Sequence, residues 1–173
     1  GVPYGLGSYM HYDKRIDTEI AASIMSINAV KGVEIGAALL AAESFGSESH
    51  DEIILKDNEF YRKTNRAGGI EGGITTGLPI IVKGMMKPIA TLMSPIKSID
   101  FKTFSEVESR RERSDFVAVP ACAVIGEAML SWSLAKFFLD KFGGDSLEEI
   151  SDNYYNYLSK TIKIIERNFK FND

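Results

Sequence analysis

The chain has 173 residues, of which 45% are hydrophobic, and its 20 Lys and Arg residues against 24 Asp and Glu residues leave a formal net charge of -4. This balance excludes the basic footprint of a nucleic-acid-binding protein, so any anion site must be local. No apolar run is expected to span a bilayer. The single cysteine, Cys122, cannot form an intrachain disulfide and indicates a reducing cytosol.

The N-terminal part begins with a turn-rich stretch, residues 1–15, that carries no initiator methionine, and we therefore expect a fragment of a longer protein. Isoleucines at helical spacing predict a helix over residues 17–31, with Gly32 at its C-terminal cap. The apolar, glycine-containing residues 33–42 favour a strand. The charged residues 43–66 predict a mobile loop with a short strand at 53–55.

A dense glycine cluster follows at residues 67–77, which hold five of the 15 glycines of the chain. The sequence AGGIEGGITTG matches neither the dinucleotide-binding nor the P-loop motif. Two interpretations stay open. The glycines either lie at bulges and hairpins of a sheet, or they let bare backbone N–H groups converge on an anion or a flat ring.

The C-terminal part predicts further strands, a connecting segment and two long helices. Pro120 is placed to start the first helix, which Gly143 and Gly144 end. Ser146 and Glu149 form a capping-box pattern for the second, which runs to about Asn168. The strands are expected at 78–82 and 89–93, and the connecting segment, helical or extended, at 101–113. Because helices and strands alternate irregularly, the pattern favours an α+β fold.

Two polar groups could bind or react with a ligand. In an extended run, Lys87 and Thr91 point to one face, where a cation and a hydroxyl suit a phosphate. The alternative is an amphipathic strand with a solvated lysine. Arg113 beside Asp115 would keep that carboxylate ionised and able to accept a proton. The alternative is a surface ion pair of little energetic value.

Asn28, with Ala29, lies near the end of the first predicted helix, where an interior asparagine often has a polar task. The alternative is a buried asparagine bound to backbone. His11 and His50 have no neighbouring pattern of metal ligands, so we expect no metal site.

Four motifs in this order resemble the C-terminal half of chorismate synthases, over roughly residues 1–134. The motifs are MSINAVKGVEIG at 25–36, TNRAGGIEGGITTG at 64–77, MKPIATL at 86–92 and ERSD at 112–115. The resemblance implies half of a layered β-α-β sandwich, with long helices packed on antiparallel sheet. It implies that residues 1–173 form the C-terminal, FMN-binding part of such an enzyme, without its N-terminal half.

The resemblance also implies a function. Chorismate synthases are carbon–oxygen lyases of the shikimate pathway of aromatic amino acid biosynthesis. They convert 5-enolpyruvylshikimate 3-phosphate to chorismate and phosphate by a 1,4-anti elimination that requires reduced FMN, and in some members NADPH reduces the flavin. The family implies a cytoplasmic homotetramer with a small-molecule substrate, no nucleic acid and no membrane partner.

Carried over by residue, the resemblance implies one catalytic group, Asp115, near the flavin N5. The implied cofactor-binding residues are Asn28, Ala29, Gly72, Lys87, Pro88, Ile89, Ala90, Thr91 and Arg113. The two active-site histidines of the family lie in its N-terminal half, and His11 and His50 do not match them. We therefore expect no turnover from this chain alone. The alternatives are a non-catalytic flavin- or phosphate-binding module of the same fold and a structural tetramerisation piece.

Overall fold

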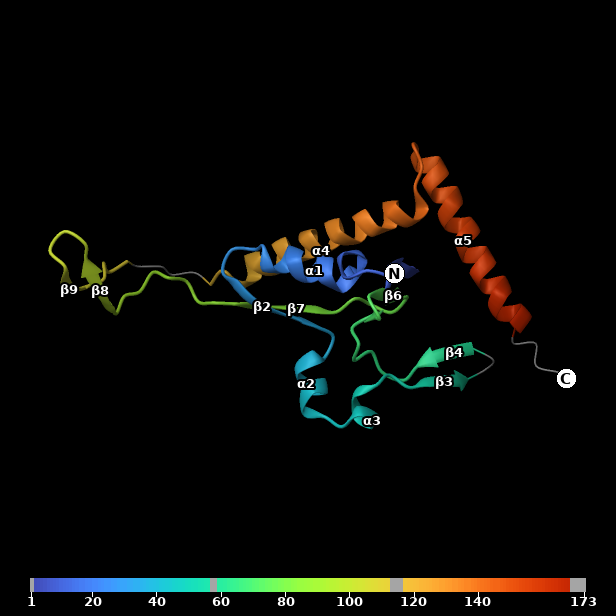
Figure 1. Cartoon of the computed structure of the whole chain (residues 1–173), viewed down its shortest axis with the longest axis horizontal. Coiled ribbons are helices and arrows are strands. Elements are labelled where there is room, and N and C mark those ends of the chain that lie inside the picture. The colour runs from blue at the N-terminus through green and yellow to red at the C-terminus, as the bar shows by residue number, and fades with distance from the viewer. Residues whose placement is uncertain (1, 57–58, 113–116, 169–173) are drawn as a thin grey trace.

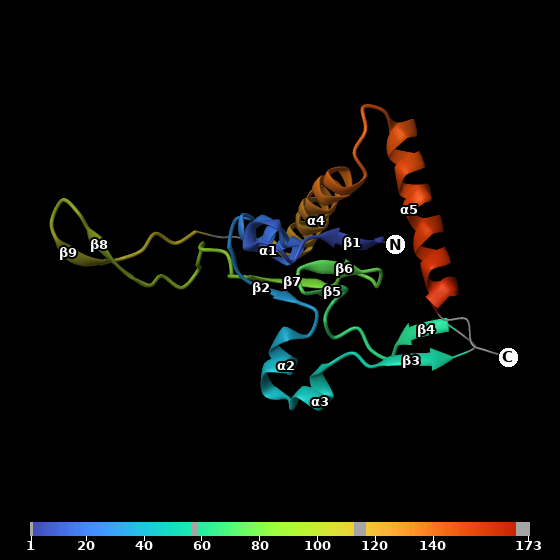
Figure 2. The ribbon, with the colours of Figure 1, turned by 45° about the vertical axis from the view of Figure 1, so that its right-hand side comes forward.

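A computed structural model describes residues 2–56, 59–112 and 117–168 of the chain. Two helices, α1 (Ile16–Met25) and α4 (Val119–Phe142), lie side by side over the antiparallel pair β2 (Val30–Ile35) and β7 (Val82–Met86), as Figures 1 and 2 show. The mixture of long helices and antiparallel strands confirms the predicted α+β class.

The remaining elements surround this centre. The other helices are η1 (Tyr12–Lys14), α2 (Ala38–Glu43), α3 (Gly46–Ser49) and α5 (Leu147–Asn168), and the other strands are β1 (Tyr4–Gly7), β3 (Ile53–Lys56), β4 (Glu59–Arg62), β5 (Ile70–Glu71), β6 (Ile74–Thr76), β8 (Lys97–Asp100) and β9 (Ser105–Glu108). Strands β1, β6 and β5 form an antiparallel sheet in that order, and β3–β4 and β8–β9 are hairpins. The β8–β9 hairpin lies at the far end of an extended arm (Figure 1).

The core forms where α1 meets α4 and the sheet. Ile16, Ile20 and Ile24 recur on one face of α1 and are at most 5% exposed, which is the stripe expected of an amphipathic helix. On the opposite helix Phe137 is buried. A polar pair lies inside this apolar contact, because the hydroxyls of Ser23 and Ser133 are 2.7 Å apart. The two hydroxyls thus satisfy each other's hydrogen bonding where the helices meet.

The helix boundaries correct part of the sequence prediction. α1 ends at Met25, six residues before the predicted end, and Asn28 therefore lies in a turn rather than in the helix. Ala29 follows with a φ of 69°, in the left-handed region, and this reverses the chain into β2. The predicted strand over 33–42 is only partly right, because β2 ends at Ile35 and α2 begins at Ala38.

The connecting segments are more regular than the sequence predicts. The short strand predicted at 53–55 is confirmed by β3, but the surrounding segment 43–66, expected to be a loop, also contains α3 and the strand β4 that pairs with β3. The strand predicted at 78–82 begins only at Val82, and residues 89–93, which lie within the described range 59–112, are in no strand. The connecting segment predicted at 101–113 contains β9.

The ends of the two long helices follow the sequence closely. α4 has Pro120 in its first turn and ends before Gly143. The predicted capping box of α5 forms, because the Glu149 backbone N–H donates to the Ser146 hydroxyl at 3.2 Å. The Glu149 carboxylate in turn accepts from the Asp145 backbone N–H at 2.7 Å. These local signals predict helix ends because their hydrogen bonds are completed within four residues.

Helix α4 corrects the expectation that no apolar segment could span a bilayer. By length and composition alone it could cross a membrane, and little of its most apolar part is buried. It also carries charged residues, and Lys136 pairs with Glu19 of α1 at 3.0 Å. A single helix of this kind assigns no membrane location.

We predict that Ser133→Ala lowers the free energy of unfolding by about 1 kcal/mol, because it leaves the nearly buried Ser23 hydroxyl without its partner on α4. Ser133→Leu should cost more, since Ser133 is 0% exposed and a larger side chain would force the helices apart. Urea unfolding measures both. Ser131→Ala, at an exposed position of the same helix, is the control and should change little. An equal loss of unfolding free energy in Ser133→Ala and Ser131→Ala would contradict the prediction.

Candidate functional site

Two segments that the sequence singled out meet at the end of the β2–β7 pair. The Lys87 backbone N–H donates a hydrogen bond of 2.8 Å to the Ala29 carbonyl. This bond extends the pairing of Val30 with Met86 by one step. Asn28 and Lys87 are both exposed, and Ala29 is half-buried in its left-handed conformation. The structure therefore brings Asn28, Ala29 and Lys87 together.

A hollow of about 370 Å³ adjoins this turn. It is lined on one side by Asn28 and Met86, and on the other by the first turns of α4. The lining residues are Ser26, Ile27, Asn28, Met86, Ala118, Ala121, Cys122, Ile125 and Met129. Within the described residues, no side chain caps the N-terminus of α4. The hollow thus combines an apolar floor with polar groups at its margin.

The segment after Lys87 has an irregular backbone. Pro88 and Ala90 are exposed, whereas Ile89 and Thr91 are half-buried. Lys87 does not share the burial of Ile89 and Thr91, and the described backbone assigns these residues to no strand, so the predicted common face of Lys87 and Thr91 stays a prediction. The role of Pro88, Ile89, Ala90 and Thr91 in cofactor binding stays a prediction from the resemblance.

The glycine cluster divides into two kinds of position. Gly68 packs against Gly36, and a Cβ on Gly36 would lie 2.0 Å from the Arg66 carbonyl oxygen, so neither backbone leaves room for a side chain. Gly72 is different, because a Cβ there would meet no atom within 4 Å, although its φ is +58°. Glycines at sheet junctions and an open, exposed glycine turn therefore coexist, and each sequence interpretation describes part of the cluster.

Asp51 holds the start of this cluster. The residue is 8% exposed, and its carboxylate accepts hydrogen bonds from the backbone N–H groups of Arg66 and Ala67 at 2.8 and 2.9 Å and from the Thr64 hydroxyl. Asn65 adds a second fastening, since its side-chain oxygen accepts from the Gly69 N–H at 2.8 Å and its amide donates to the Pro79 carbonyl at 2.9 Å.

These contacts decide the charge of Asp51. Burial alone raises the pKa of this carboxyl, but the hydrogen bonds from Thr64, Ala67 and Arg66, with the positive charge of Arg62, together hold its pKa below the ordinary value. The nearly buried Glu34 shows the same direction, because the Leu39 N–H and the Lys83 ammonium lower its pKa. Both carboxylates are therefore ionised anchors of backbone.

The two groups of predicted residues lie at opposite ends of α1. At its start, the Ile16 N–H donates to the Gly73 carbonyl at 3.1 Å, next to Gly72, whereas Asn28 follows its end. Ten helical residues rise about 15 Å. The structure therefore does not cluster Gly72 with Asn28 and Lys87. Arg113 and Asp115 lie outside the described residues.

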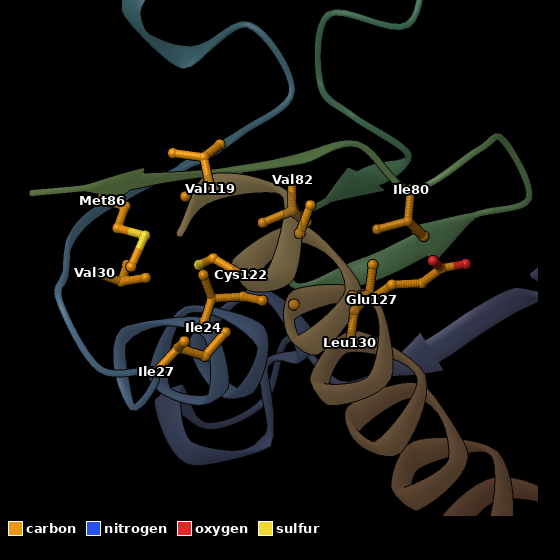
Figure 3. Close-up of a pocket in the computed structure, with 13 residues that line it drawn as sticks. Ile24, Ile27, Val30, Ile80, Val82, Met86, Val119, Cys122, Glu127 and Leu130 are labelled. Atoms are coloured by element: carbon orange, nitrogen blue, oxygen red, sulfur yellow. The ribbon is translucent and has the colours of Figure 1, made fainter. Parts of the chain in front are cut away.

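A second hollow, of about 290 Å³, lies in the seam between α1, α4 and β7 (Figure 3). Aliphatic side chains such as Ile24, Val82 and Leu130 line it, with Cys122 and the exposed Glu127 at α4. It holds none of the predicted site residues. Within the described residues, no group of three or more His, Cys, Asp and Glu side chains could hold a metal ion.

The described residues form an α+β fold whose loop ends carry exposed backbone at Gly72, the exposed Asn28 and the exposed Lys87. The family model for chorismate synthase matches residues 1–139. The chorismate synthase of Bacillus licheniformis is 51% identical over 154 residues, which are 88% of this chain and 40% of that protein. That of Syntrophotalea carbinolica is 52% identical over 157 residues, 91% of this chain and 41% of that protein.

A crystal structure of chorismate synthase is 44% identical and has a TM-score of 0.74, covering 92% of this chain and 40% of that one. The chain belongs to the chorismate synthase family. It spans about 40% of the length of the curated relatives that it matches.

Sequence reasoning missed Asp51 and Glu34 as organising residues. Asp51 lies in the charged stretch GSESHDE, which predicts a solvated loop, and its partners follow 13 to 16 residues later. An aspartate ahead of a Thr-Asn-Arg turn was the available signal. The importance of Asp51 is visible only in the fold, because the β3–β4 hairpin brings Thr64, Arg66 and Ala67 next to its carboxylate.

We predict that Asp51→Asn lowers the free energy of unfolding at pH 7 by about 2 kcal/mol, because it removes the charge that accepts three hydrogen bonds and turns an amide donor toward backbone N–H groups. Since the folded-state pKa of Asp51 is lowered, this stability is present above its unfolded pKa of about 3.9. It is lost as pH falls through the folded-state value.

Chemical denaturation at pH 7, 5 and 3 measures this difference. The gap between Asp51→Asn and the unaltered chain should be equal at pH 7 and 5 and narrower at pH 3. Asp152→Asn, at an exposed position on α5, is the control. A gap that widens in acid would contradict the assignment of Asp51 as an ionised anchor.

Proposed function

We propose that this chain is the C-terminal, FMN-binding part of a chorismate synthase. The complete enzyme eliminates phosphate from 5-enolpyruvylshikimate 3-phosphate to give chorismate, by a 1,4-anti elimination that requires reduced FMN. Family membership with about 50% identity over nearly the whole chain supports this proposal. Because the chain covers about 40% of such relatives, we propose that it has no turnover alone.

The observation that carries the proposal is the hydrogen bond between the Lys87 N–H and the Ala29 carbonyl. It joins the two loops that the family resemblance assigns to one cofactor, although they are 58 residues apart in the chain (87 minus 29). The bond fixes the backbone from which an exposed ammonium and an exposed carboxamide project. A cation beside a carboxamide suits a ligand with both a phosphate and a ring that accepts hydrogen bonds.

The chemistry of these groups fits reduced FMN. Lys87 supplies a point charge for a phosphate, and Asn28 supplies donors and an acceptor at the rim of an apolar hollow that a flat ring could cover. Gly72 offers a backbone that no side chain shields. When bound, reduced FMN supplies transient electron density to the substrate as phosphate leaves.

Each of these residues has a binding or orienting task in the proposal. Lys87 holds the cofactor phosphate, and Asn28 and Ala29 orient the nearby ring edge. The Gly72 N–H, at the opposite end of α1, donates to a part of the cofactor that lies away from these residues. Pro88 restricts Lys87 to an extended conformation and so limits where the ammonium can point. Arg113 and Asp115, outside the described residues, complete the proposed set as a charge partner and a proton acceptor.

The remaining family properties belong to the same proposal. They are a cytoplasmic location, a homotetramer of the complete enzyme, and flavin reduction by NADPH in some members. Many large apolar side chains of this chain are exposed, including Trp132 at 74%, Val124 at 68% and Phe104 at 84%. Surfaces of this kind support contact with further protein in the complete assembly.

We predict that Lys87→Ala raises the dissociation constant for reduced FMN about fivefold, since an exposed ion pair contributes about 1 kcal/mol. Anaerobic titration followed by flavin fluorescence or absorbance measures it. The loss should shrink at high salt, which screens the ammonium. Lys97→Ala, which removes an exposed lysine paired with Glu106 on the β8–β9 hairpin, is the control. No flavin response from the unaltered chain would refute the proposal and favour a structural piece.

A further inference from the structure

A chain of polar contacts connects Asp51 to the residue that precedes Gly72. Arg62, at the end of β4, donates to the Asp51 backbone carbonyl at 3.3 Å and to both carboxylate oxygens of Glu71, at 3.0 and 2.5 Å. The Asp51 carboxylate meanwhile holds the Arg66 and Ala67 backbone N–H groups. We call Asp51, Arg62 and Glu71 the clasp. The clasp contacts the glycine cluster at its start, through the Arg66 and Ala67 N–H groups, and next to Gly72, through Glu71.

The clasp matters because packing does not fix Gly72. A Cβ at this position would meet nothing within 4 Å, and the residue is exposed. By contrast, Gly68 and Gly73 are buried against neighbouring backbone and the Arg15 side chain. Glycine also has the largest conformational freedom of any residue. An exposed glycine with a φ of +58° therefore depends on its neighbours to stay in one conformation.

We propose that Arg62 and Glu71, anchored through Asp51, are positioning residues that preset the Gly72 backbone for its ligand. This inference rests on the proposed function, because it takes that ligand to be FMN. The two parallel N–H to oxygen bonds between Arg62 and Glu71 fix direction as well as distance, which a single ion pair does not. The side chain of Glu71 is thus bound by Arg62 of β4. Its backbone is fixed by the pairing of β5 with β6.

The ion pair between Arg62 and Glu71 contributes little to the free energy of unfolding of the whole chain. The side chain of Arg62 is 22% exposed and that of Glu71 is 42% exposed, and such pairs stabilise proteins weakly. Preorganisation acts differently, since a ligand that meets an already ordered backbone avoids the entropy of ordering it. The clasp should therefore affect ligand affinity and local backbone exchange more than the melting temperature.

The same hairpin provides a matched control. Glu52 and Lys63 form an ion pair of 2.9 Å, with exposed fractions of 60% and 63%. This pair joins the ends of β3 and β4 next to Arg62, and among the described residues its ion pair does not involve the glycine cluster. Glu52→Gln, like Glu71→Gln, removes one carboxylate that pairs with a cation at the C-terminal end of β4. Any effect that is specific to Gly72 must therefore be absent from Glu52→Gln.

The experiment uses the full chain with Glu71→Gln, Arg62→Lys and the control Glu52→Gln. Hydrogen exchange measured by mass spectrometry reports the backbone over residues 68–77, and anaerobic titration reports the dissociation constant for reduced FMN. Glu71→Gln and Arg62→Lys should each raise exchange in that segment and weaken FMN binding about fivefold to tenfold, with an unchanged melting temperature. The charge-swapped double variant Arg62→Glu with Glu71→Arg should recover only part of the affinity, because a glutamate at position 62 restores the ion pair but cannot donate to the Asp51 carbonyl.

The outcomes separate the two proposals. If the unaltered chain gives no flavin response, the proposed function fails, while exchange over 68–77 still decides whether the clasp orders the loop. Unchanged exchange and unchanged affinity in Glu71→Gln would overturn the clasp even where the unaltered chain binds FMN. Equal losses in Glu71→Gln and Glu52→Gln would also overturn it, because they would reflect hairpin charge rather than a contact with Gly72.

Discussion

The burial of one face of α1 is the constraint on which the rest of the structure depends. Ile16, Ile20 and Ile24 belong to the buried core that α1 shares with α4 and the strands, and their burial fixes the position of the helix. The N-terminal end of α1 then meets the glycine cluster through the bond between Ile16 and Gly73. Its C-terminal end leads into the turn of Asn28 and Ala29. One buried helix thus sets the spacing of both groups of candidate residues.

The sequence predicted the features that depend on near neighbours. The spacing of isoleucines located α1, and the side chains of Ser146 and Glu149 located the start of α5, because these signals act within one or two helical turns. It did not predict where α1 ends. That boundary depends on Ala29, which adopts a left-handed conformation that alanine rarely favours and that the sheet pairing of β2 enforces.

In the candidate site too, the features set by contacts between distant segments were not predicted from the sequence. The resemblance selected Lys87 and Gly72, but composition and spacing could not show that Lys87 binds the Ala29 backbone or that Gly72 is open whereas Gly68 is tightly packed. These facts arise from contacts between distant segments. Asp51 was missed for that reason, since its value lies in three donors supplied after a hairpin. The charged stretch around Asp51 therefore predicted a solvated loop, whereas Asp51 is buried and its carboxylate binds backbone N–H groups.

The exposure of the site limits what these residues can do alone. Asn28, Lys87 and Gly72 all face solvent, where a charge interacts several times more weakly than in a dry pocket. Loss of phosphate develops charge that enzymes stabilise with preorganised groups in a water-excluded site. The described residues supply ordered binding groups without that enclosure. The proposed elimination therefore requires further protein over this face, and the proposed task of this part of the fold is to bind and orient the cofactor.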